Sequence, residues 1–399
     1  MPPIQSIQAE LQAQGLDGWL FYDFHHRDPI AQRILGVSGG VGTRRWFYLI
    51  PRRGQPKKLV HRIESAALDS LPGNKEIYAS LEELKHALRR LLAGRRTVAM
   101  QYSPRNAIPY VSMVDAGTVE LVRAQGCRVV SSADLVQRFE ACWSAAQFRS
   151  HREAGRIIDE IIQAAFGLAA QRVRRPGRSP LTEYGLQQWI LQRFRSAGIV
   201  TDHPPIVAIG RHAGDPHYEP QPTRSAAIGK GKLLLLDVWG KVNRPGSVYY
   251  DVTWVGYTGR EVPAKYCKVF AIVAAARDCA IEFVQKSLQM GREIQGWQVD
   301  RVAREVICKA GYGPYFIHRT GHSIGQEVHG AGANMDSLET HDARRILPRT
   351  CFSIEPGIYL PEFGVRSEVN VYIDGSMARV TGLVQTEILP LLAWARKLL

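Results

Sequence analysis

The sequence predicts a two-domain α/β protein, in which a smaller α/β domain is followed by a larger mixed α/β (α+β) domain. The chain has 399 residues, about two to three times the commonest domain size. Short apolar runs of β type alternate with helical stretches up to about residue 136, and a long amphipathic helix replaces this alternation just after Trp143. We therefore expect domains at 1–143 and 144–399.

The first domain is predicted from apolar runs that turn residues separate. A helix is expected at 80–92, where apolar side chains recur every three or four residues. The turn Arg52-Arg53-Gly54 divides two of the apolar runs. Strands are expected at 19–22, 46–50, 58–61, 96–100 and 127–130. This alternation is typical of a small α/β domain.

The second domain begins with Ser144-Ala-Ala-Gln147, a capping box that starts a helix. The helix has one apolar face and should end before Pro176-Gly177. After it we expect a helix at 181–197, a strand at 206–209, a hairpin at 232–255, two helices between 263 and 310, and strands to the C-terminus.

Composition and charge indicate a folded soluble protein without a nucleic-acid partner. Hydrophobic residues make up 45% and charged residues 22% of the chain, as in ordinary globular proteins. The net charge of +14 would suit an anionic partner if the charge were gathered on one face. The basic residues instead fall in short separated groups such as Arg44-Arg45 and Arg89-Arg90, which favours a solvated basic surface.

The cellular address is predicted from cysteine usage and from missing signals. Six cysteines without a C-x-x-C pair indicate free, mostly buried thiols in a reducing compartment. The first residues lack a secretory signal, and no apolar stretch reaches the roughly 18 to 20 residues of a spanning helix. We expect a cytoplasmic protein without membrane contact.

Two aspartates are expected to face each other in the predicted hairpin. Asp237 follows four leucines, and Asp251 begins the returning strand. If the hairpin is centred near Arg244, the two carboxylates lie opposite one another at a buried position. Buried facing carboxylates cannot both stay ionised without compensation, so either one pKa rises or a cation lies between them. A multivalent metal ion meets this requirement.

A second acidic pair follows near the C-terminus. Glu355 leads through a turn near Pro361 to Glu368, so the two glutamates should end near each other on adjacent strands. Period-2 alternation places Arg366, Glu368 and Asn370 on one face of the strand. A guanidinium should therefore project beside the second glutamate. A salt-bridged strand residue is the alternative for any one of these acids.

Histidines complete the predicted site. The segment from His318 to His329 contains a further imidazole at His322. The spacing of His318 and His322 resembles that of a helical zinc pair, but Gly321 and Gly325 would break the helix, so an extended or looped segment is expected. One imidazole among four carboxylates suits two divalent ions, with Mn²⁺ favoured and Zn²⁺ or Co²⁺ next.

With this set assembled, the chain resembles the pita-bread metallopeptidases, the family of creatinase, aminopeptidase P, prolidase and methionine aminopeptidase. The first 140 residues are similar to the creatinase-type N-terminal domain of prolidase and aminopeptidase P. The matching motifs are Asp215-Pro-His217-Tyr218, Leu236-Asp237-Val-Trp-Gly240, Tyr250-Asp251-Val-Thr253, His318-Arg-Thr-Gly-His322-Ser-Ile-Gly325 with His329, Ile354-Glu355-Pro-Gly-Ile-Tyr359 and Val365-Arg366-Ser-Glu368.

The resemblance implies a role for each matching residue. The implied ligands of two metals are Asp237, Asp251, His322, Glu355 and Glu368, with Asp251 and Glu368 bridging. Glu355 would also act as general base, His329 would stabilise the oxyanion, and His217 would lie over the scissile region. His318 and Arg366 are candidates for holding substrate carboxylate or carbonyl groups. The alternative for Arg366 is a supporting partner of Glu368.

The implied activity is metal-dependent hydrolysis of the peptide bond before proline, in Xaa-Pro dipeptides, by a homodimer. The loop 341–345 could present Arg344 or Arg345 to the substrate carboxylate. Aminopeptidase P, which acts on longer Xaa-Pro peptides, shares every catalytic residue and is the alternative. A non-enzymatic binding protein with the same fold is the alternative of another class, and creatine hydrolysis is set aside because all five ligand types are present.

Three departures from the family pattern affect the expected substrate. Trp254 stands where arginine is common, and Gly330 stands where an acidic residue is common. His341 occupies the position at which some prolidases place an arginine for the substrate carboxylate. The metal ligands are untouched, so these departures concern substrate length and the preferred first residue.

Overall fold

The computed structural model describes residues 3–37, 42–177 and 179–394. The chain divides into two compact units, Met1–Glu140 and Ala141–Leu399. In the described part of the chain, no helix has both the length and the apolar character needed to cross a membrane. All six cysteines are free, as predicted, although Cys267 and Cys308 are exposed rather than buried.

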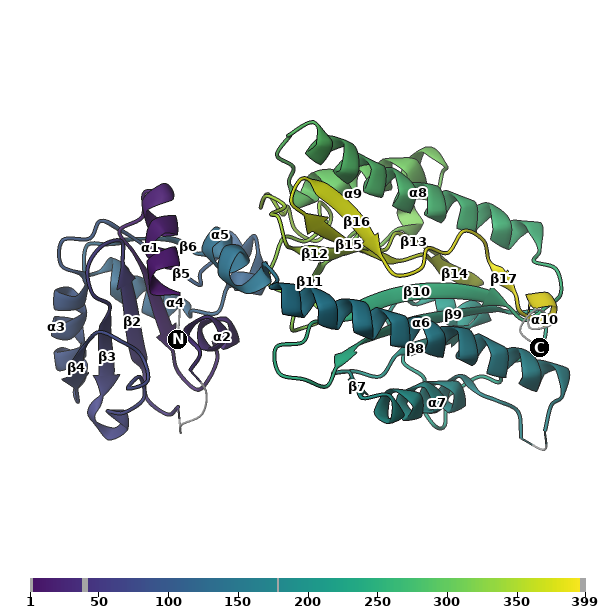
Figure 1. Ribbon diagram of the computed structural model, residues 1–399, viewed down its shortest axis with the longest axis horizontal. Coiled ribbons are helices and arrows are strands. Elements are labelled where there is room, and N and C mark those ends of the chain that lie inside the picture. The colour runs from purple at the N-terminus through teal and green to yellow at the C-terminus, as the bar shows by residue number, and fades with distance from the viewer. Residues whose placement is uncertain (1–2, 38–41, 178, 395–399) are drawn as a thin grey trace. The chain divides into compact units, whose positions relative to one another are not determined.

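The first unit is built on a mixed sheet with the strand order β4-β3-β2-β1-β5-β6 (Figure 1). The strands are β1 (Gly18–Asp23), β2 (Trp46–Pro51), β3 (Lys57–His61), β4 (Asn74–Tyr78), β5 (Thr97–Met100) and β6 (Arg128–Ser131). The neighbours β1, β2 and β3 pair antiparallel, and the other pairs are parallel. Every residue of the central strands β1 and β2 is buried.

Helices pack against this sheet. They are α1 (Ile4–Ala13), α2 (Pro29–Leu35), α3 (Leu81–Leu92) and α4 (Ala116–Arg123), and the short helix α5 (Ala133–Val136) follows β6. The Ser80 hydroxyl caps α3 by accepting a hydrogen bond from the Glu83 N–H. The predicted strands and this helix are confirmed to within about one residue at each end. The prediction missed β4, because this edge strand exposes most of its side chains and lacks an apolar pattern.

The second unit consists of long helices and three sheets. The helices are α6 (Ala145–Arg174), α7 (Glu183–Ser196), α8 (Ala264–Gln289), α9 (Gly296–Lys309) and α10 (Leu391–Trp394). The strands are β7 (Ile199–Val200), β8 (Ile206–Ile209), β9 (Leu233–Val242), β10 (Tyr250–Tyr257), β11 (Ser323–Ile324), β12 (Cys351–Ile354), β13 (Gly357–Leu360), β14 (Phe363–Arg366), β15 (Val369–Asp374), β16 (Met377–Thr381) and β17 (Leu389–Pro390). The capping box of Ser144 and Gln147 starts α6, as predicted.

The sheets lie between two layers of helices (Figure 1). The sheet β17-β10-β9-β7, to which β8 is added through β9, packs against α6 and α7 and buries Phe166, Leu236 and Val252. Helix α8 packs against the sheet β11-β12-β15-β16 and the hairpin β13-β14. This packing buries residues such as Phe270 and Phe352. The run 233–236 is entirely apolar because the strand that contains it is buried on both faces.

Near the start of α6, a buried histidine makes the stability of the second unit dependent on pH. The side chain of His151 is fully buried, with Nδ1 2.7 Å from the Tyr249 carbonyl oxygen and Nε2 2.6 Å from the Thr381 hydroxyl oxygen. Burial lowers the pKa of His151 to about 4. The folded protein therefore keeps this imidazole neutral at pH values where the unfolded chain has bound a proton.

We expect the free energy of unfolding to fall by roughly 3 kcal/mol from this residue as pH drops from about 6.5 to about 4. In that window the unfolded state binds the extra proton, so stability rises with pH. We would measure the free energy of unfolding of the full chain by denaturant at pH 7.5 and at pH 5.0. The decrease between the two pH values should be smaller for His151→Gln than for the wild type. The exposed His203→Gln serves as the control, and an equal pH dependence in all three proteins would contradict the assignment.

Candidate metal centre

The centre begins with the pairing of β9 and β10. Asp237 lies opposite Thr253, and Asp251 lies opposite Trp239. The expectation that the two aspartates directly face each other is therefore wrong: they are diagonal neighbours on one face of the sheet. The hairpin is centred one residue later than predicted, and the Tyr249 N–H donates to the Gly325 carbonyl oxygen instead of extending the ladder. The observed register of β9 and β10 thus occurs together with a hydrogen bond from Tyr249 to Gly325, a residue far away in the chain.

The second acidic pair has the predicted placement. Ile354 of β12 pairs with Val369 of β15, so Glu355 and Glu368 lie at neighbouring strand ends. Between them, β13 and β14 form a hairpin that pairs Leu360 with Phe363. The sequence located this pair correctly because both strands are short and joined by a tight hairpin.

Three side chains around the start of β15 reach β10, in agreement with the predicted alternation. The Arg366 Nε donates to the Thr253 hydroxyl at 2.8 Å, and Glu368 Oε2 lies 2.8 Å from the same hydroxyl. The Asn370 amide brackets Asp251 by accepting from its N–H at 3.0 Å and donating to its carbonyl oxygen. Thr253, which our sequence analysis did not single out, therefore joins the two halves of the centre.

His322 lies in the looped segment that precedes β11, as predicted. A Cβ at Gly321 would come within 1.9 Å of the Ser353 carbonyl oxygen, so only glycine allows this close approach. The Ser353 hydroxyl accepts from the His322 N–H at 2.9 Å and donates to Glu355 Oε1 at 3.0 Å. One serine thus places both His322 and Glu355.

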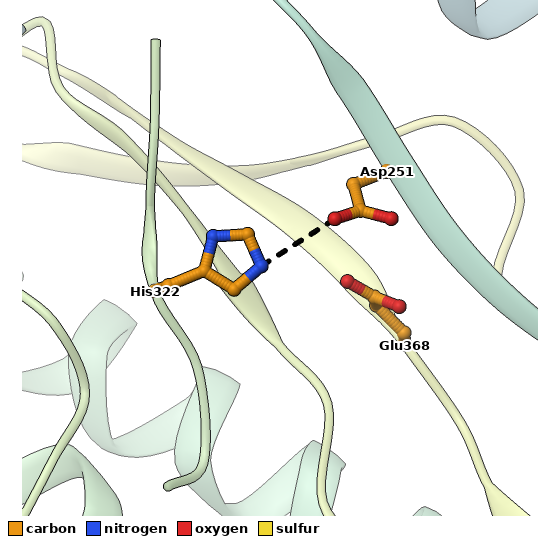
Figure 2. A group of neighbouring side chains, drawn as sticks. All are labelled: Asp251, His322 and Glu368. Carbon is orange, nitrogen blue, oxygen red and sulfur yellow. Dashed lines mark ion pairs between the residues drawn. The ribbon is translucent and has the colours of Figure 1, made fainter. Parts of the chain in front are cut away.

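Asp251, His322 and Glu368 converge on one point (Figure 2). Ligand atoms of these three buried side chains lie within 4.8 Å of one another. The His322 Nε2 is 3.4 Å from Asp251 Oδ2 and 3.4 Å from Glu355 Oε1. Its Nδ1 lies 3.2 Å from the Ser323 carbonyl oxygen, which favours a proton on Nδ1 and would leave the Nε2 lone pair for a bound cation. Without a cation, Asp251 and Glu355 outweigh burial and raise the pKa of His322, so the imidazole tends to carry a positive charge.

The pKa values of the acids reflect an excess of buried negative charge. Burial raises the pKa of Asp237 to about 7, with Asp251 and Glu355 adding to the rise and Arg366 opposing it. Burial and the neighbouring acids raise the pKa of Glu368 well above its usual range, and burial also raises that of Asp251. For Glu355, His322 and Arg366 outweigh burial, so its pKa is lowered.

The residues present fit divalent cations. Asp251 Oδ1 and Glu368 Oε1 are buried carboxylate oxygens without a hydrogen-bond partner in the described structure. Buried polar atoms without partners are costly, and a cation would satisfy both oxygens. Carboxylates with one imidazole are a donor set for hard or borderline divalent ions.

Arg366 supports the acids through contacts that differ from those expected. Its guanidinium forms an ion pair with Asp237 rather than with Glu368, and its NH1 donates to the Tyr359 hydroxyl at 3.1 Å. The Tyr359 hydroxyl also lies 2.7 Å from His318 Nε2, and His318 Nδ1 lies 2.6 Å from the Arg319 carbonyl oxygen. His318 and Arg366, the two residues predicted to bind substrate, therefore already have partners within a hydrogen-bond network that includes Tyr359 and Asp237.

The two remaining histidines lie on loops beside this network. The ring of His329 meets that of His322 edge to face at 4.4 Å. The charge of His322, together with burial, lowers the pKa of His329 to about 3, so His329 is neutral at physiological pH. His217 is exposed, and its N–H donates to Asp215 Oδ1 at 3.0 Å.

A buried glutamate that the sequence analysis missed holds the loop that carries His217. Glu183, at the start of α7, is fully buried and accepts from the N–H groups of Ile209 and Ala226 at 2.7 and 2.8 Å. Its carboxylate also meets His212 Nδ1 at 2.9 Å and the Tyr218 hydroxyl at 2.7 Å. The only sequence signal was an acid in the first turn of a helix, which is common for other reasons.

Asp300 of α9 fixes the segment that leads to His322, as Glu183 fixes the loop that carries His217. The carboxylate is fully buried and accepts from the Thr320 N–H at 2.9 Å and from the Ser337 N–H at 3.0 Å. Arg304, one turn later, pairs with Asp300 and donates to the His318 carbonyl oxygen at 2.8 Å. Both loops that carry site histidines are therefore fixed by buried acids on helices.

The loop 341–345 does not offer the expected arginine. Arg344 is 4% exposed, and its guanidinium is occupied by Asp342 and by the Ala331 carbonyl oxygen. Arg345 forms an exposed ion pair with Glu293. The expectation that one of them receives a substrate carboxylate is wrong for this arrangement, because local acids neutralise both. His341 is exposed and stacks on Trp297.

Comparison with known proteins agrees with this geometry. Residues 149–375 match Metallopeptidase family M24. The chain belongs to this family. It is similar to the "Xaa-Pro dipeptidase" of Lactobacillus delbrueckii subsp. lactis, at 31% identity over 59% of this chain and 58% of that protein. A Mycobacterium tuberculosis protein named "Probable dipeptidase PepE" is 28% identical over 86% of each chain.

Solved structures named as dipeptidases and aminopeptidases share the fold over nearly the whole chain. Dipeptidase PepE from Mycobacterium ulcerans superposes with a TM-score of 0.73 at 22% identity, covering 97% of this chain and 96% of that one. X-Pro aminopeptidase from Thermotoga maritima gives a TM-score of 0.63 at 19% identity over 98% and 99% of the two chains. The α/β fold with a creatinase-type first domain and a pita-bread second domain is thereby confirmed, and this M24 protein is a dipeptidase-like metallopeptidase whose family implies divalent metal ions.

We predict opposite effects of one substitution with and without metal. Glu368→Gln removes a buried acid whose neighbours repel it, so the metal-free protein should become more stable, by roughly 2 to 4 °C in Tm for each kcal/mol relieved. The same change should weaken Mn²⁺ binding by at least tenfold and reduce the rise in Tm on adding Mn²⁺. Thermal unfolding and calorimetric titration measure both effects, with the exposed Glu219→Gln as control. A variant that binds Mn²⁺ like the wild type would contradict the assignment.

A second prediction concerns the loop fixed by Glu183. Glu183→Gln replaces an acceptor of two N–H groups with a group that is half donor, so the loop that carries His217 should shift while the metal ligands stay in place. We expect kcat to fall about a hundredfold with unchanged metal content. The kcat of the double variant Glu183→Gln/His217→Ala should be little lower than that of His217→Ala alone, because both changes remove the contribution of His217 to the reaction. Additive losses would show that Glu183 acts elsewhere.

Proposed function

We propose that this M24 protein hydrolyses Xaa-Pro dipeptides and releases free proline. The observation that carries the proposal is the convergence of Asp251, His322 and Glu368, with Glu355 beside them, around two buried oxygens without partners. The similarity over most of the chain to proteins named dipeptidases supports the choice of substrate. Asp237 would complete the ligand set of a second ion once Arg366 released part of its carboxylate.

The proposed chemistry assigns a step to each residue around the centre. Two bound divalent ions would lower the pKa of a water molecule and polarise the scissile carbonyl group. Glu355, whose pKa is held low, is ionised and can take the proton of the attacking water. His329 is neutral and can donate an N–H to the carbonyl oxygen as negative charge develops there.

The substrate preference follows from the bond before proline. This bond is a tertiary amide without an N–H, so the site needs no acceptor at the scissile nitrogen. His217, on the loop held by Glu183, would lie over the substrate. We expect Mn²⁺ as the native metal with Zn²⁺ or Co²⁺ as substitutes, a cytoplasmic homodimer, and neither a nucleic-acid nor a membrane partner.

Aminopeptidase P activity is the second candidate, and one observation favours it. Arg344 and Arg345 are neutralised by Asp342 and Glu293, so they do not form the carboxylate pocket that would reject longer peptides. A non-enzymatic binding protein is less well supported, because a chain that only binds peptides has no need for buried carboxylate oxygens without partners, such as Asp251 Oδ1 and Glu368 Oε1. These possibilities differ in how turnover depends on substrate length.

A length series on the Mn²⁺-loaded protein tests the proposal. Proline released from Leu-Pro should exceed Leu released from Leu-Pro-Gly or Leu-Pro-Gly-Gly by about a hundredfold or more in kcat/KM, if residues other than Arg344 and Arg345 receive the terminal carboxylate and are left unpaired when that group is missing. Equal or faster turnover of the longer peptides would replace the dipeptidase proposal with aminopeptidase P. Full activity after exhaustive chelation, or no hydrolysis of any peptide by the loaded protein, would refute both enzymatic proposals.

A further inference from the structure

A hollow lies on the face of β10 opposite to the metal centre. Side chains alternate along a strand, so Asp251 and Thr253 face the acids while Tyr250 and Trp254 face α6. Between α6, β10 and the segment 381–389 two adjoining cavities of about 300 and 230 Å³ share Asp159 and Leu383 as lining residues. Together they reach the size range of small-molecule sites.

One end of the hollow is apolar. Ile162 and Phe166 of α6, Trp254 of β10 and Leu389 of β17 line it. Trp254 contributes an indole ring to this end of the hollow. The apolar end is suited to a branched or aromatic side chain of a ligand.

The other end carries separated charges. The Asp159 side chain is buried, accepts hydrogen bonds from the Tyr250 hydroxyl at 2.9 Å and from the Leu383 backbone N–H, and forms no ion pair within the described residues. Burial raises the pKa of Asp159 to about 6, so the carboxylate is mostly ionised above pH 7. Arg152 is exposed at the edge of the hollow and lies near enough to lower that pKa, and among the described residues its guanidinium makes neither a hydrogen bond nor an ion pair.

The charged and apolar groups follow one another along α6. Arg152, Asp159 and Phe166 are seven residues apart, which places them on one face about two turns from each other. A ligand that matches this order has an anionic group, a cationic group and an apolar group. A free α-amino acid with an apolar side chain carries all three, and because they share one carbon atom the long side chains of Arg152 and Trp254 must span the roughly 10 Å between successive positions on the helix.

We propose that this hollow is a second binding site, for a free apolar α-amino acid. The ammonium group pairs with Asp159, the carboxylate faces Arg152, and the side chain packs on Trp254 and Phe166. The ammonium supplies the cation that the buried Asp159 lacks, which is the strongest single reason for this occupant. The inference concerns binding and does not depend on the proposed peptidase activity.

The walls of the hollow are formed before a ligand arrives. Gln385 fixes the segment 381–389 by accepting from the Val255 N–H at 2.9 Å and donating to the Val255 carbonyl oxygen at 2.6 Å. The buried Arg277 donates to the Gln385 carbonyl oxygen at 2.7 Å. A Cβ at Gly382, where φ is +83°, would lie 1.8 Å from the Tyr250 hydroxyl oxygen, so glycine is required there. A fixed site loses little conformational entropy on binding.

Calorimetric titration of the Mn²⁺-loaded full chain with L-leucine tests the inference. Leucine should bind at least tenfold more tightly than 3-methylbutylamine, which lacks the carboxylate, and than 4-methylpentanoate, which lacks the ammonium group. Glycine, which lacks the side chain, should not bind measurably. Absence of leucine binding, or binding of 3-methylbutylamine as tight as that of leucine, would overturn the assignment of an amino acid.

Variants locate the binding. Asp159→Asn keeps an acceptor for Tyr250 and should weaken leucine binding at least tenfold, and Trp254→Ala should weaken it independently of any effect on Asp159. Glu153→Gln and Arg172→Gln, on the same helix but outside the hollow, are the matched controls. Asp251→Ala separates this site from the metal centre and should retain leucine binding. Binding that is lost in Asp251→Ala but unchanged in Asp159→Asn and Trp254→Ala would place leucine at the metal centre and refute the second site.

Discussion

Four carboxylates share one buried volume in the second unit, and their mutual repulsion is the constraint around which the rest of the centre is arranged. Asp237, Asp251, Glu355 and Glu368 are all largely removed from water, while Arg366 forms ion pairs with two of them, Asp237 and, at 3.9 Å, Glu355. Repulsion and desolvation together cost several kcal/mol unless the acids bind protons or cations. The raised pKa values of three of them record this cost.

The fold meets the constraint by fixing the backbone around each acid. The Asn370 amide holds both backbone groups of Asp251, the Ser353 hydroxyl joins His322 to Glu355, and the Thr253 hydroxyl lies between Asp237, Glu368 and Arg366. Each of these side chains comes from a strand, where position is more rigid than in a loop. The carboxylate oxygens therefore keep their positions in the absence of a metal ion, and the site is preorganised for binding one.

The histidines are positioned by a different device. His217 and His322 belong to irregular segments, which are held by the fully buried Glu183 and Asp300 on α7 and α9. In both cases a helix supplies one carboxylate that accepts several hydrogen bonds from a loop. Strand β10 also has two functional faces in our interpretation, since the strand that presents Asp251 to the metal centre presents Tyr250 and Trp254 to the hollow behind it.

Local patterns in the sequence were enough to predict the α/β class, the elements at the centre of each sheet, and the identity of the acids that converge. These follow from local patterns, because apolar periodicity and turn residues act within a few positions of the chain. The strand pair of Glu355 and Glu368 was placed correctly for the same reason, since a tight hairpin joins the strands. The edge strand β4, which lacks an apolar pattern, was missed.

Contacts between residues far apart in the chain could be read only from the folded structure. The hairpin of β9 and β10 is centred one residue later than the sequence predicts. Just before β10, the Tyr249 N–H donates to the carbonyl oxygen of Gly325, which lies far away in the chain. Arg366 pairs with Asp237, 129 positions away, and Arg344 is neutralised within its own loop instead of facing a substrate. The partner of a buried charge is chosen by whichever opposite charge the completed fold brings nearest, and no local pattern in the sequence records that choice.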